Sequence, residues 1–119
     1  MILVDSSVWI NHFRRTEPQL QALLEHKLVA LHPFVLGELA CGNPRNWSAT
    51  MAELRLLPRA SVAREPDVHS LLEARRLRGH GLGWIDLHLL ASALINGYRL
   101  WTADQALAAA ALPLGLRFG

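Results

Sequence analysis

The hydrophobic positions along the chain form two patterns, short unbroken apolar runs and longer repeats with helical spacing. The short runs predict strands, because they hold too few residues for a helix. Strands are expected at residues 2–5, 28–31, 60–63, 98–101 and 114–118. The longer repeats predict a helix after Ser6 or Ser7 and others at 17–27, 33–42, 50–57, 66–79, 84–96 and 103–111. Such an alternation of strands and helices is typical of α/β proteins.

Small polar residues mark the expected starts of two of these helices. Ser6 or Ser7 is suited to cap the first helix, because a side-chain oxygen at that position can accept a backbone N–H. Thr50 and Glu53 have the spacing of a capping box, so the fourth helix is expected to begin at Thr50.

The order of the elements predicts one α/β domain over residues 1–119, in which a short, mainly parallel central sheet is flanked by helices. The chain is long enough for a single hydrophobic core, and no repeat or linker divides it. Ligands of such sheets bind beyond the carboxyl ends of the strands. Asp5 follows one predicted strand end, and Asp104 lies shortly after another.

The composition is rich in apolar residues, since 51% of the chain is hydrophobic and 18% is charged. The surplus indicates a surface buried against a partner or a second copy of the chain, or else a dense helical core. No apolar stretch approaches the roughly 18 residues that span a membrane. The N-terminus has no basic leader and Cys41 is the only cysteine, so we expect a cytoplasmic protein without an internal disulfide.

The basic residues are almost all arginines. The formal net charge is only +2, but eleven of the twelve basic residues are arginine, with Lys27 as the single lysine. Arginine suits bidentate contacts to phosphate and stacking on bases. A GC-rich genome produces the same bias, so the charge alone leaves both explanations open.

Three of the four aspartates stand in unusual positions. The exception is Asp67, which lies in the first turn of a predicted helix, where a carboxylate is ordinary. Asp5 and Asp104 follow strand ends, although either could instead cap the helix that comes after it. Asp86 lies in a helix that is apolar on nearly every side, which marks that helix as a central one.

Asp86 and Glu38 are both carboxylates within otherwise apolar helices. Asp86 shares a helix face with Leu89 and Leu90, where an unpaired carboxylate costs on the order of several kcal/mol. It therefore needs a cation, a protonated form, or a position that opens onto a cleft. The alternatives are a first-turn aspartate bonded to backbone N–H groups and, for Glu38, a salt bridge to a nearby arginine.

As a set, Asp5, Glu38, Asp86 and Asp104 are expected to converge at one edge of the sheet. Their mutual repulsion would raise their pKa values and destabilise the fold unless a divalent cation neutralised it. Ligands that are all oxygen favour Mg²⁺ or Mn²⁺ over zinc. A zinc site has little support, because there is no HExxH or CxxC motif and the six histidines are scattered.

Four blocks of the sequence resemble the signature blocks of the PIN domain, and most of all those of the VapC toxins of bacterial toxin–antitoxin pairs. The blocks are VDSSVWI at 4–10, VLGELACG at 35–42, GLGWIDLHLLASAL at 81–94 and LWTADQAL at 100–107. They follow the family's order and cover nearly the full chain. The resemblance implies a PIN-like three-layer sandwich. The residues that match the family's metal-binding acids are Asp5, Glu38, Asp86 and Asp104, with supporting hydroxyls at Ser7 and Thr102.

The resemblance also implies metal-dependent hydrolysis of RNA, with one or two Mg²⁺ or Mn²⁺ ions held by these acids. The substrate would be a structured RNA such as transfer or ribosomal RNA, and a VapB-type antitoxin would neutralise the toxin. A homodimer face and an antitoxin groove would account for the apolar surplus. Candidate RNA contacts, for which a solvated helix face is the simpler explanation, are Arg14, Arg15, Arg75, Arg76, Arg78 and His80.

Other families that begin with a strand and an aspartate fit less well. A haloacid-dehalogenase phosphatase needs a second aspartate where this chain has Ser7, and a receiver domain needs a lysine late in the chain. A DNA or flap nuclease needs extra helices for which the chain is short. The remaining alternative is a PIN-fold module that docks RNA or protein without cutting it. The presence of all four acids argues against that alternative, because acids without a metal bind a polyanion poorly.

Overall fold

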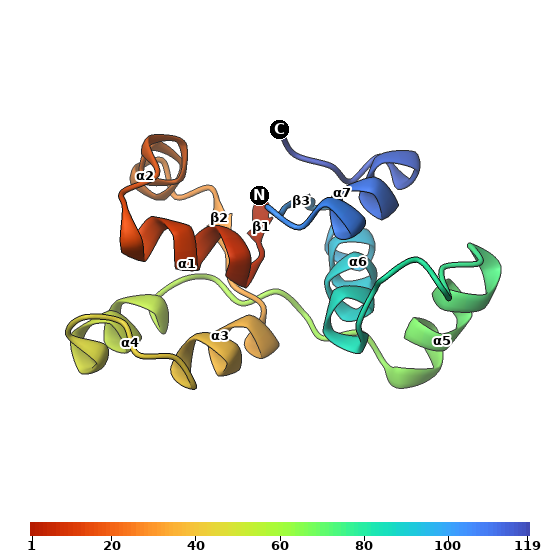
Figure 1. Cartoon of the computed structure of the whole chain (residues 1–119), viewed down its shortest axis with the longest axis horizontal. Coiled ribbons are helices and arrows are strands. Elements are labelled where there is room, and N and C mark those ends of the chain that lie inside the picture. Colours follow the sequence, from red (N-terminus) through yellow and green to blue (C-terminus); the bar gives the residue numbers. More distant parts are fainter.

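The computed structural model describes residues 1–119, and three short parallel strands lie at the centre of the molecule (Figure 1). β1 (Ile2–Val4) lies between β2 (Val29–Ala30) and β3 (Arg99–Trp101), so the strand order is β2-β1-β3. Both pairings are parallel. The carboxyl ends of all three strands therefore meet at one edge of the sheet, the edge at which ligands of such sheets bind.

Two isolated parallel bridges continue the sheet on either side. Leu31 pairs with Arg59 next to β2, and Leu100 pairs with Arg117 next to β3. The strand predicted at 114–118 is therefore wrong as a full strand. Its first residue ends a 3-10 turn, and the segment contributes one bridge to the sheet.

Helices flank the strands, with α1 to α4 on one side and α5 to α7 on the other (Figure 1). Their bounds are α1 Ser6–Arg14, α2 Pro18–Glu25, α3 Pro33–Ala40, α4 Trp47–Leu54, α5 Glu65–Ala74, α6 Trp84–Asn96 and α7 Gln105–Ala111, followed by the 3-10 turn η1 Leu112–Leu114. This is the predicted α/β arrangement of a short parallel sheet between helices. None of the helices is both long enough and apolar enough to cross a membrane.

Helix α4 begins earlier than its capping signal predicts. It starts at Trp47, after Asn46 in the left-handed region with φ of 51°, a conformation that asparagine tolerates better than most residues. The predicted capping box does not form, because the Thr50 hydroxyl donates to the backbone carbonyl of Arg45 at 3.1 Å.

Helix α5 ends at Ala74, well before the predicted end at residue 79. Arg76 is left-handed with φ of 52°, and the N–H of Leu77 donates to the carbonyl of Leu72 at 3.0 Å. This bond is typical of a Schellman turn, and it turns Leu77 back to pack against the core. The predicted arginines therefore lie in the loop after the helix and not in its last turn: Arg75, Arg76 and Arg78.

The strand predicted at 60–63 does not form either. The Ser61 carbonyl accepts the Ser92 hydroxyl at 2.6 Å, and the Ser61 N–H donates to the side chain of Asn96 at 3.4 Å. This backbone is thus bonded to side chains of α6, which leaves no ladder of strand hydrogen bonds.

Helix α6 is buried through its middle, as its apolar pattern predicts. Residues 87–93 are all buried. Leu89 and Leu90 belong to the same core cluster as Leu3 of β1 and Leu100 of β3, and none of the four has exposed surface. Because α6 is anchored in this way, the side chains of its first turn have a fixed place beside the sheet.

Candidate active site

Asp5 follows β1 directly and is almost fully buried, with 6% of its surface exposed. Its Oδ2 atom accepts hydrogen bonds from the hydroxyls of Ser7 and Thr102, both at 2.7 Å. The Ser6 hydroxyl makes a longer contact with Oδ1 at 3.4 Å. Asp5 occupies the N-cap position of α1, but its side chain makes no capping bond. A purely capping role for Asp5 is therefore excluded.

Ser7 and Thr102 join the ends of β1 and β3 around Asp5. The Ser7 Oγ accepts the N–H of Ala103 at 3.0 Å, and the Thr102 Oγ1 accepts the N–H of Asp104 at 3.0 Å. Because each hydroxyl oxygen accepts a backbone N–H, its proton is available for the Asp5 carboxylate. The expectation that Ser6 or Ser7 caps α1 is wrong, since both lie in its first turn and their hydroxyls point to Asp5.

Asp104 lies at the N-cap of α7, where the capping alternative is realised. Its Oδ1 atom accepts the N–H of Leu107 at 3.1 Å, and the residue is exposed. The other oxygen, Oδ2, has no hydrogen-bond partner in the protein. Asp104 is therefore a cap with one oxygen still available for a ligand.

Asp86 lies in the first turn of α6, half-buried beside the sheet edge. Its Oδ2 atom accepts the N–H of Gly83 at 2.9 Å, so the first-turn alternative also holds for one oxygen. Burial raises the pKa of Asp86, and the charges of Asp5 and Asp104 raise it further, against the opposing effect of the Gly83 N–H. One backbone bond thus leaves the carboxylate incompletely compensated.

Glu38 is an exposed residue of α3 and faces the same region, where it is only partly desolvated. Burial raises the pKa of Glu38, and so do the charges of Asp5 and Asp86, while the Ser6 hydroxyl acts in the opposite direction. The ion pairs of the chain lie elsewhere: Arg64 with Asp67, and His69 with Glu65. The alternative of a salt bridge between Glu38 and an arginine is therefore excluded.

The structure brings the four acids into one electrostatic cluster at the carboxyl edge of the sheet. The charge of Asp5 raises the pKa values of Glu38 and Asp86, and the charge of Asp104 raises the pKa of Asp86. No cationic side chain forms an ion pair with any of the four acids. Carboxylate oxygens are the ligands that Mg²⁺ and Mn²⁺ prefer, so the donor set fits such an ion. The cluster is loose, since no three carboxylate, imidazole or thiolate groups of the chain lie close enough together to hold one ion.

The predicted basic residues fall into two separate groups. Arg14 ends α1 and lines a pocket that includes Glu38, whereas Arg15 follows it outside that pocket. The second group lies in the loop after α5, where Arg76 and Arg78 line a second pocket, of about 630 Å³, that contains none of the four acids. All members of this loop group are exposed: Arg75, Arg76, Arg78 and His80.

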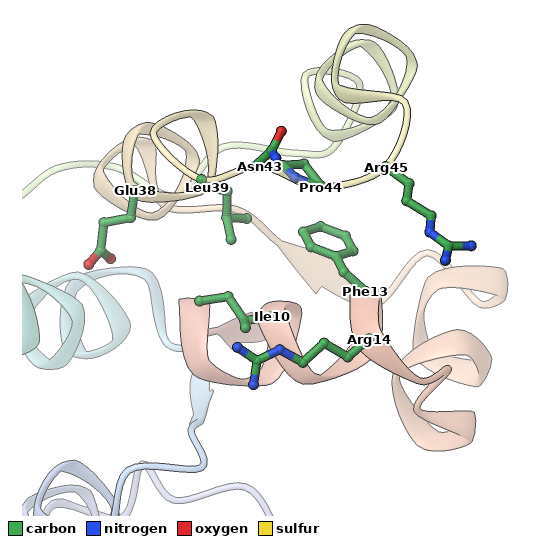
Figure 2. Close-up of a pocket in the computed structure, with 9 residues that line it drawn as sticks. Ile10, Phe13, Arg14, Glu38, Leu39, Asn43, Pro44 and Arg45 are labelled. Carbon is green, nitrogen blue, oxygen red and sulfur yellow. The ribbon is translucent and has the colours of Figure 1, made fainter.

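The pocket beside Glu38 has a volume of about 650 Å³ and lies between α1, α3 and the loop that leads to α4 (Figure 2). Its lining includes Arg45, which the sequence analysis does not single out. The sequence signal for Arg45 was weak, because Asn43–Pro44 marks a loop there but says nothing of where the following side chain points.

His32 is a buried residue that the sequence analysis also missed. It caps α3, where its Nδ1 accepts the N–H of Phe34 at 2.9 Å, and it has no exposed surface. Burial and the neighbouring His88 lower the pKa of His32 to about 4, so it is neutral at physiological pH. Phe34 packs edge-on against His88 of α6 at 4.8 Å between ring centroids. These rings join the helices that carry Glu38 and Asp86, and a histidine before a helix-opening proline was the available signal.

Comparisons with known proteins agree with this architecture. A model of the PIN domain matches residues 2–112. The chain is 42% identical over 117 residues to proteins named Ribonuclease VapC32 from two strains of Mycobacterium tuberculosis, CDC 1551 / Oshkosh and H37Rv, covering 98% of this chain and 94% of theirs. The crystal structure of PAE2754 from Pyrobaculum aerophilum has a TM-score of 0.59 at 19% identity, over 91% of this chain and 82% of that one. At that identity the solved structure supports the fold alone.

Proposed function

Because the chain belongs to the PIN-domain family and is a VapC-type member of it, we propose that it is a metal-dependent endoribonuclease. We propose further that it is the toxin of a toxin–antitoxin pair and that residues 1–119 form one PIN domain. The observation that carries the proposal is the acidic cluster around Asp5. A divalent cation would stabilise this arrangement, in which a buried carboxylate held by two hydroxyls lies beside two acids whose pKa values are raised by burial and by neighbouring carboxylates.

The proposed ligands of Mg²⁺ or Mn²⁺, one or two ions bound directly or through water, are Asp5, Glu38, Asp86 and Asp104. Each aspartate of the cluster has one oxygen committed to the protein and one that lacks a short hydrogen bond. This pattern supports ligation through a single oxygen of each. A bound ion would lower the pKa of a water molecule and neutralise charge on the phosphate during hydrolysis.

The remaining residues of the site hold these carboxylates in place. Ser7 and Thr102 fix the orientation of Asp5, because both donate to the same oxygen. The Gly83 N–H does the same for Asp86. The reaction then requires no protein nucleophile, since an activated water attacks the phosphodiester.

The proposed partners follow from the VapC relatives. We expect an RNA substrate, such as transfer or ribosomal RNA, a VapB-type antitoxin, a homodimer and action in the cytoplasm. An antitoxin arginine would inhibit by contributing positive charge to the acidic cluster. A purified cognate antitoxin that binds the protein and leaves RNA cleavage unchanged would contradict this mode of inhibition.

A direct test of the nuclease is cleavage of total RNA by the purified protein in Mg²⁺, in Mn²⁺ and in EDTA. Asp5→Ala and Asp86→Ala, prepared in the same way, control for a contaminating ribonuclease. We expect discrete products that need the ion and are absent with both variants. Cleavage that survives both substitutions would contradict the assignment of the acids.

A non-catalytic PIN module that docks RNA or protein is the second candidate. One observation favours it, namely that no three of the acids lie close enough together to hold one ion. The same experiment distinguishes the two functions. A folded protein that binds RNA and yields no products in either ion would favour the docking module.

A further inference from the structure

The loop between α5 and α6, residues 75–83, is called the basic loop here because it begins with the segment RRLRGH at 75–80. It lies on the side of the molecule away from α1 to α4 (Figure 1). None of its basic side chains forms an ion pair. Exposed guanidinium groups without carboxylate partners attract phosphates, to which arginine binds in a bidentate manner. The exposed basic residues are Arg75, Arg76, Arg78 and His80.

The backbone of the basic loop is fixed at both ends. After α5, the N–H of Leu77 donates to the carbonyl of Leu72 at 3.0 Å, and Leu77 packs against the core. Near the other end, Leu82 also packs against the core. The arginines therefore extend from a backbone that is already ordered, so little backbone entropy is lost when they bind a ligand.

Two of these arginines line one pocket of about 630 Å³. The other residues of its lining are Leu72 and Glu73. Glu73 is exposed and forms no ion pair with either arginine, so both guanidinium groups are free to bind an anion. With Arg76 and Arg78 against one glutamate, the lining carries net positive charge.

The far end of the basic loop adjoins the acidic cluster at two points. The N–H of Gly83 donates to Oδ2 of Asp86 at 2.9 Å. A β-carbon at Gly81 would lie 3.7 Å from the Cβ of Ala106, in the first turn of the helix that Asp104 caps. An RNA strand whose phosphodiester is held at the acids would therefore meet this loop as it continues toward α5.

We propose that the basic loop binds the phosphate backbone of the RNA on one side of the phosphodiester that is cleaved, with Arg76 and Arg78 as the principal contacts. The inference rests on the proposed function and deepens it, since it states the direction in which the substrate leaves the acids. RNA fits this surface better than a protein partner does. The exposed residues of 75–81 are arginine, glycine and histidine, whereas the centre of a protein interface is apolar.

The test measures binding of fluorescein-labelled bulk transfer RNA by fluorescence anisotropy, in an Asp5→Asn background that prevents cleavage. Arg76→Gly and Arg78→Ala are each expected to weaken binding about tenfold, the usual effect of losing a charged hydrogen bond. Each should also reduce the salt dependence of binding by roughly 0.7–0.9 in the log–log slope, the value for one phosphate contact.

Glycine is the replacement at Arg76 because this residue has φ of 52°, a conformation that glycine adopts without steric cost. Arg76→Gly should therefore weaken binding of transfer RNA while its melting temperature stays the same or rises by up to a few degrees. The loss of binding then cannot come from unfolding.

Lys27→Gly is the matched control. Lys27 is exposed, has φ of 56° and lies just before β2, at the amino edge of the sheet. The control removes one positive charge from the same backbone conformation, and it should bind transfer RNA as the parent does.

Glu73→Gln tests the same pocket with the opposite sign. It removes the one negative charge of the lining without shortening the side chain. Binding of transfer RNA should become about two- to threefold tighter, since an exposed charge contributes little. Weaker binding by this variant would contradict a phosphate beside Arg76 and Arg78.

The inference is overturned if Arg76→Gly and Arg78→Ala bind transfer RNA as the parent does, or if Lys27→Gly weakens binding equally, since the effect would then reflect net charge. Cleavage by the same variants in the Asp5 wild-type background separates this inference from the proposed function. A raised KM with kcat retained supports the basic loop as a backbone contact. Metal-dependent cleavage with both constants unchanged leaves the nuclease intact and overturns the role of the loop. A wild-type protein that cleaves no RNA at all would instead overturn the proposed function.

Discussion

The two acids that follow strands and the two that lie inside helices are held in different ways. Asp5 accepts the hydroxyls of Ser7 and Thr102 where β1 and β3 end, and Asp104 accepts the N–H of Leu107 in α7. Glu38 and Asp86 lie across from them on α3 and α6, and burial and neighbouring charges raise the pKa values of both.

The difference indicates a division of labour within one site. On the strand side, Asp5 is fixed by a network of hydrogen bonds and Asp104 by one helix-capping bond. The helix side carries carboxylates whose ionised forms are less favoured, although Asp86 also accepts the N–H of Gly83. A divalent ion would be oriented by the first pair and would relieve the repulsion felt by the second. Substitutions at these residues test the difference between the strand-side and the helix-side acids.

The largest effect is expected at Asp5. Asp5→Asn preserves the size of the side chain but removes the charge at the centre of the cluster. We expect RNA cleavage to fall more than about 100-fold, beyond the 10–100-fold typical of residues that only support a metal ligand. Single-turnover cleavage of a mapped RNA substrate measures the change, and a loss below tenfold would contradict the central place of Asp5.

The next effect should come from the hydroxyl of Thr102. Thr102→Val keeps the shape of the side chain but removes its hydroxyl. Asp5 then loses one of its hydrogen bonds, and the N–H of Asp104 loses its acceptor. Cleavage should fall about 10–100-fold, and the free energy of unfolding should drop by about 1–3 kcal/mol. Thr102→Ser is the matched control, because serine keeps the hydroxyl. It should recover most of the cleavage rate, measured by kinetics, and most of the free energy of unfolding, measured in urea.

A smaller effect is expected at Asp104, where capping and ion binding can be separated. Asparagine caps helices as well as aspartate does, so Asp104→Asn should keep stability within about 0.5 kcal/mol of the wild type. Loss of its charge should nevertheless reduce cleavage about tenfold. Asp104→Ala, which loses the cap as well, should also unfold about 1 kcal/mol more easily. Wild-type activity in Asp104→Asn would show that this residue is only a cap.

The smallest effect concerns the stability of the helix side. Since the pKa of Glu38 is raised in the folded protein, its ionisation opposes folding. That contribution is absent below the ordinary glutamate pKa of 4.5, grows as pH rises above it, and is complete above the raised pKa. In EDTA, Glu38→Gln should therefore melt up to a few degrees higher than the wild type at pH 7.5, with no difference near pH 4. Scanning calorimetry at both pH values measures this, and a variant that melts lower at pH 7.5 would contradict the repulsion.

The elements predicted correctly from the sequence are those fixed by local signals. The apolar run of β1 and the continuous apolar helix α6 carry their pattern within a few residues, and α6 has the predicted bounds. The errors lie where distant contacts decide the outcome. Side chains of α6 bind the backbone of Ser61, where no strand forms, and α5 ends early at the left-handed Arg76, after which Leu77 packs against the core.

The candidate site was predictable in its residue types but not in its surroundings. The four acids stand out because each is unusual for its own predicted element. Arg45 and His32 do not, since a loop arginine and a histidine before a proline are common in any sequence. Only the fold brings Arg45 to the pocket beside Glu38, and only the fold stacks Phe34, after His32, against His88 of α6.

The most direct test of the central claim is calorimetric titration of Mn²⁺ into the wild-type protein, Asp5→Asn and Asp86→Asn at pH 7.5. If the acidic cluster is the site of a divalent ion, the wild type should bind Mn²⁺ saturably, and both variants should bind it at least about tenfold more weakly. Equal Mn²⁺ binding by all three folded proteins would place the ion elsewhere and contradict the account.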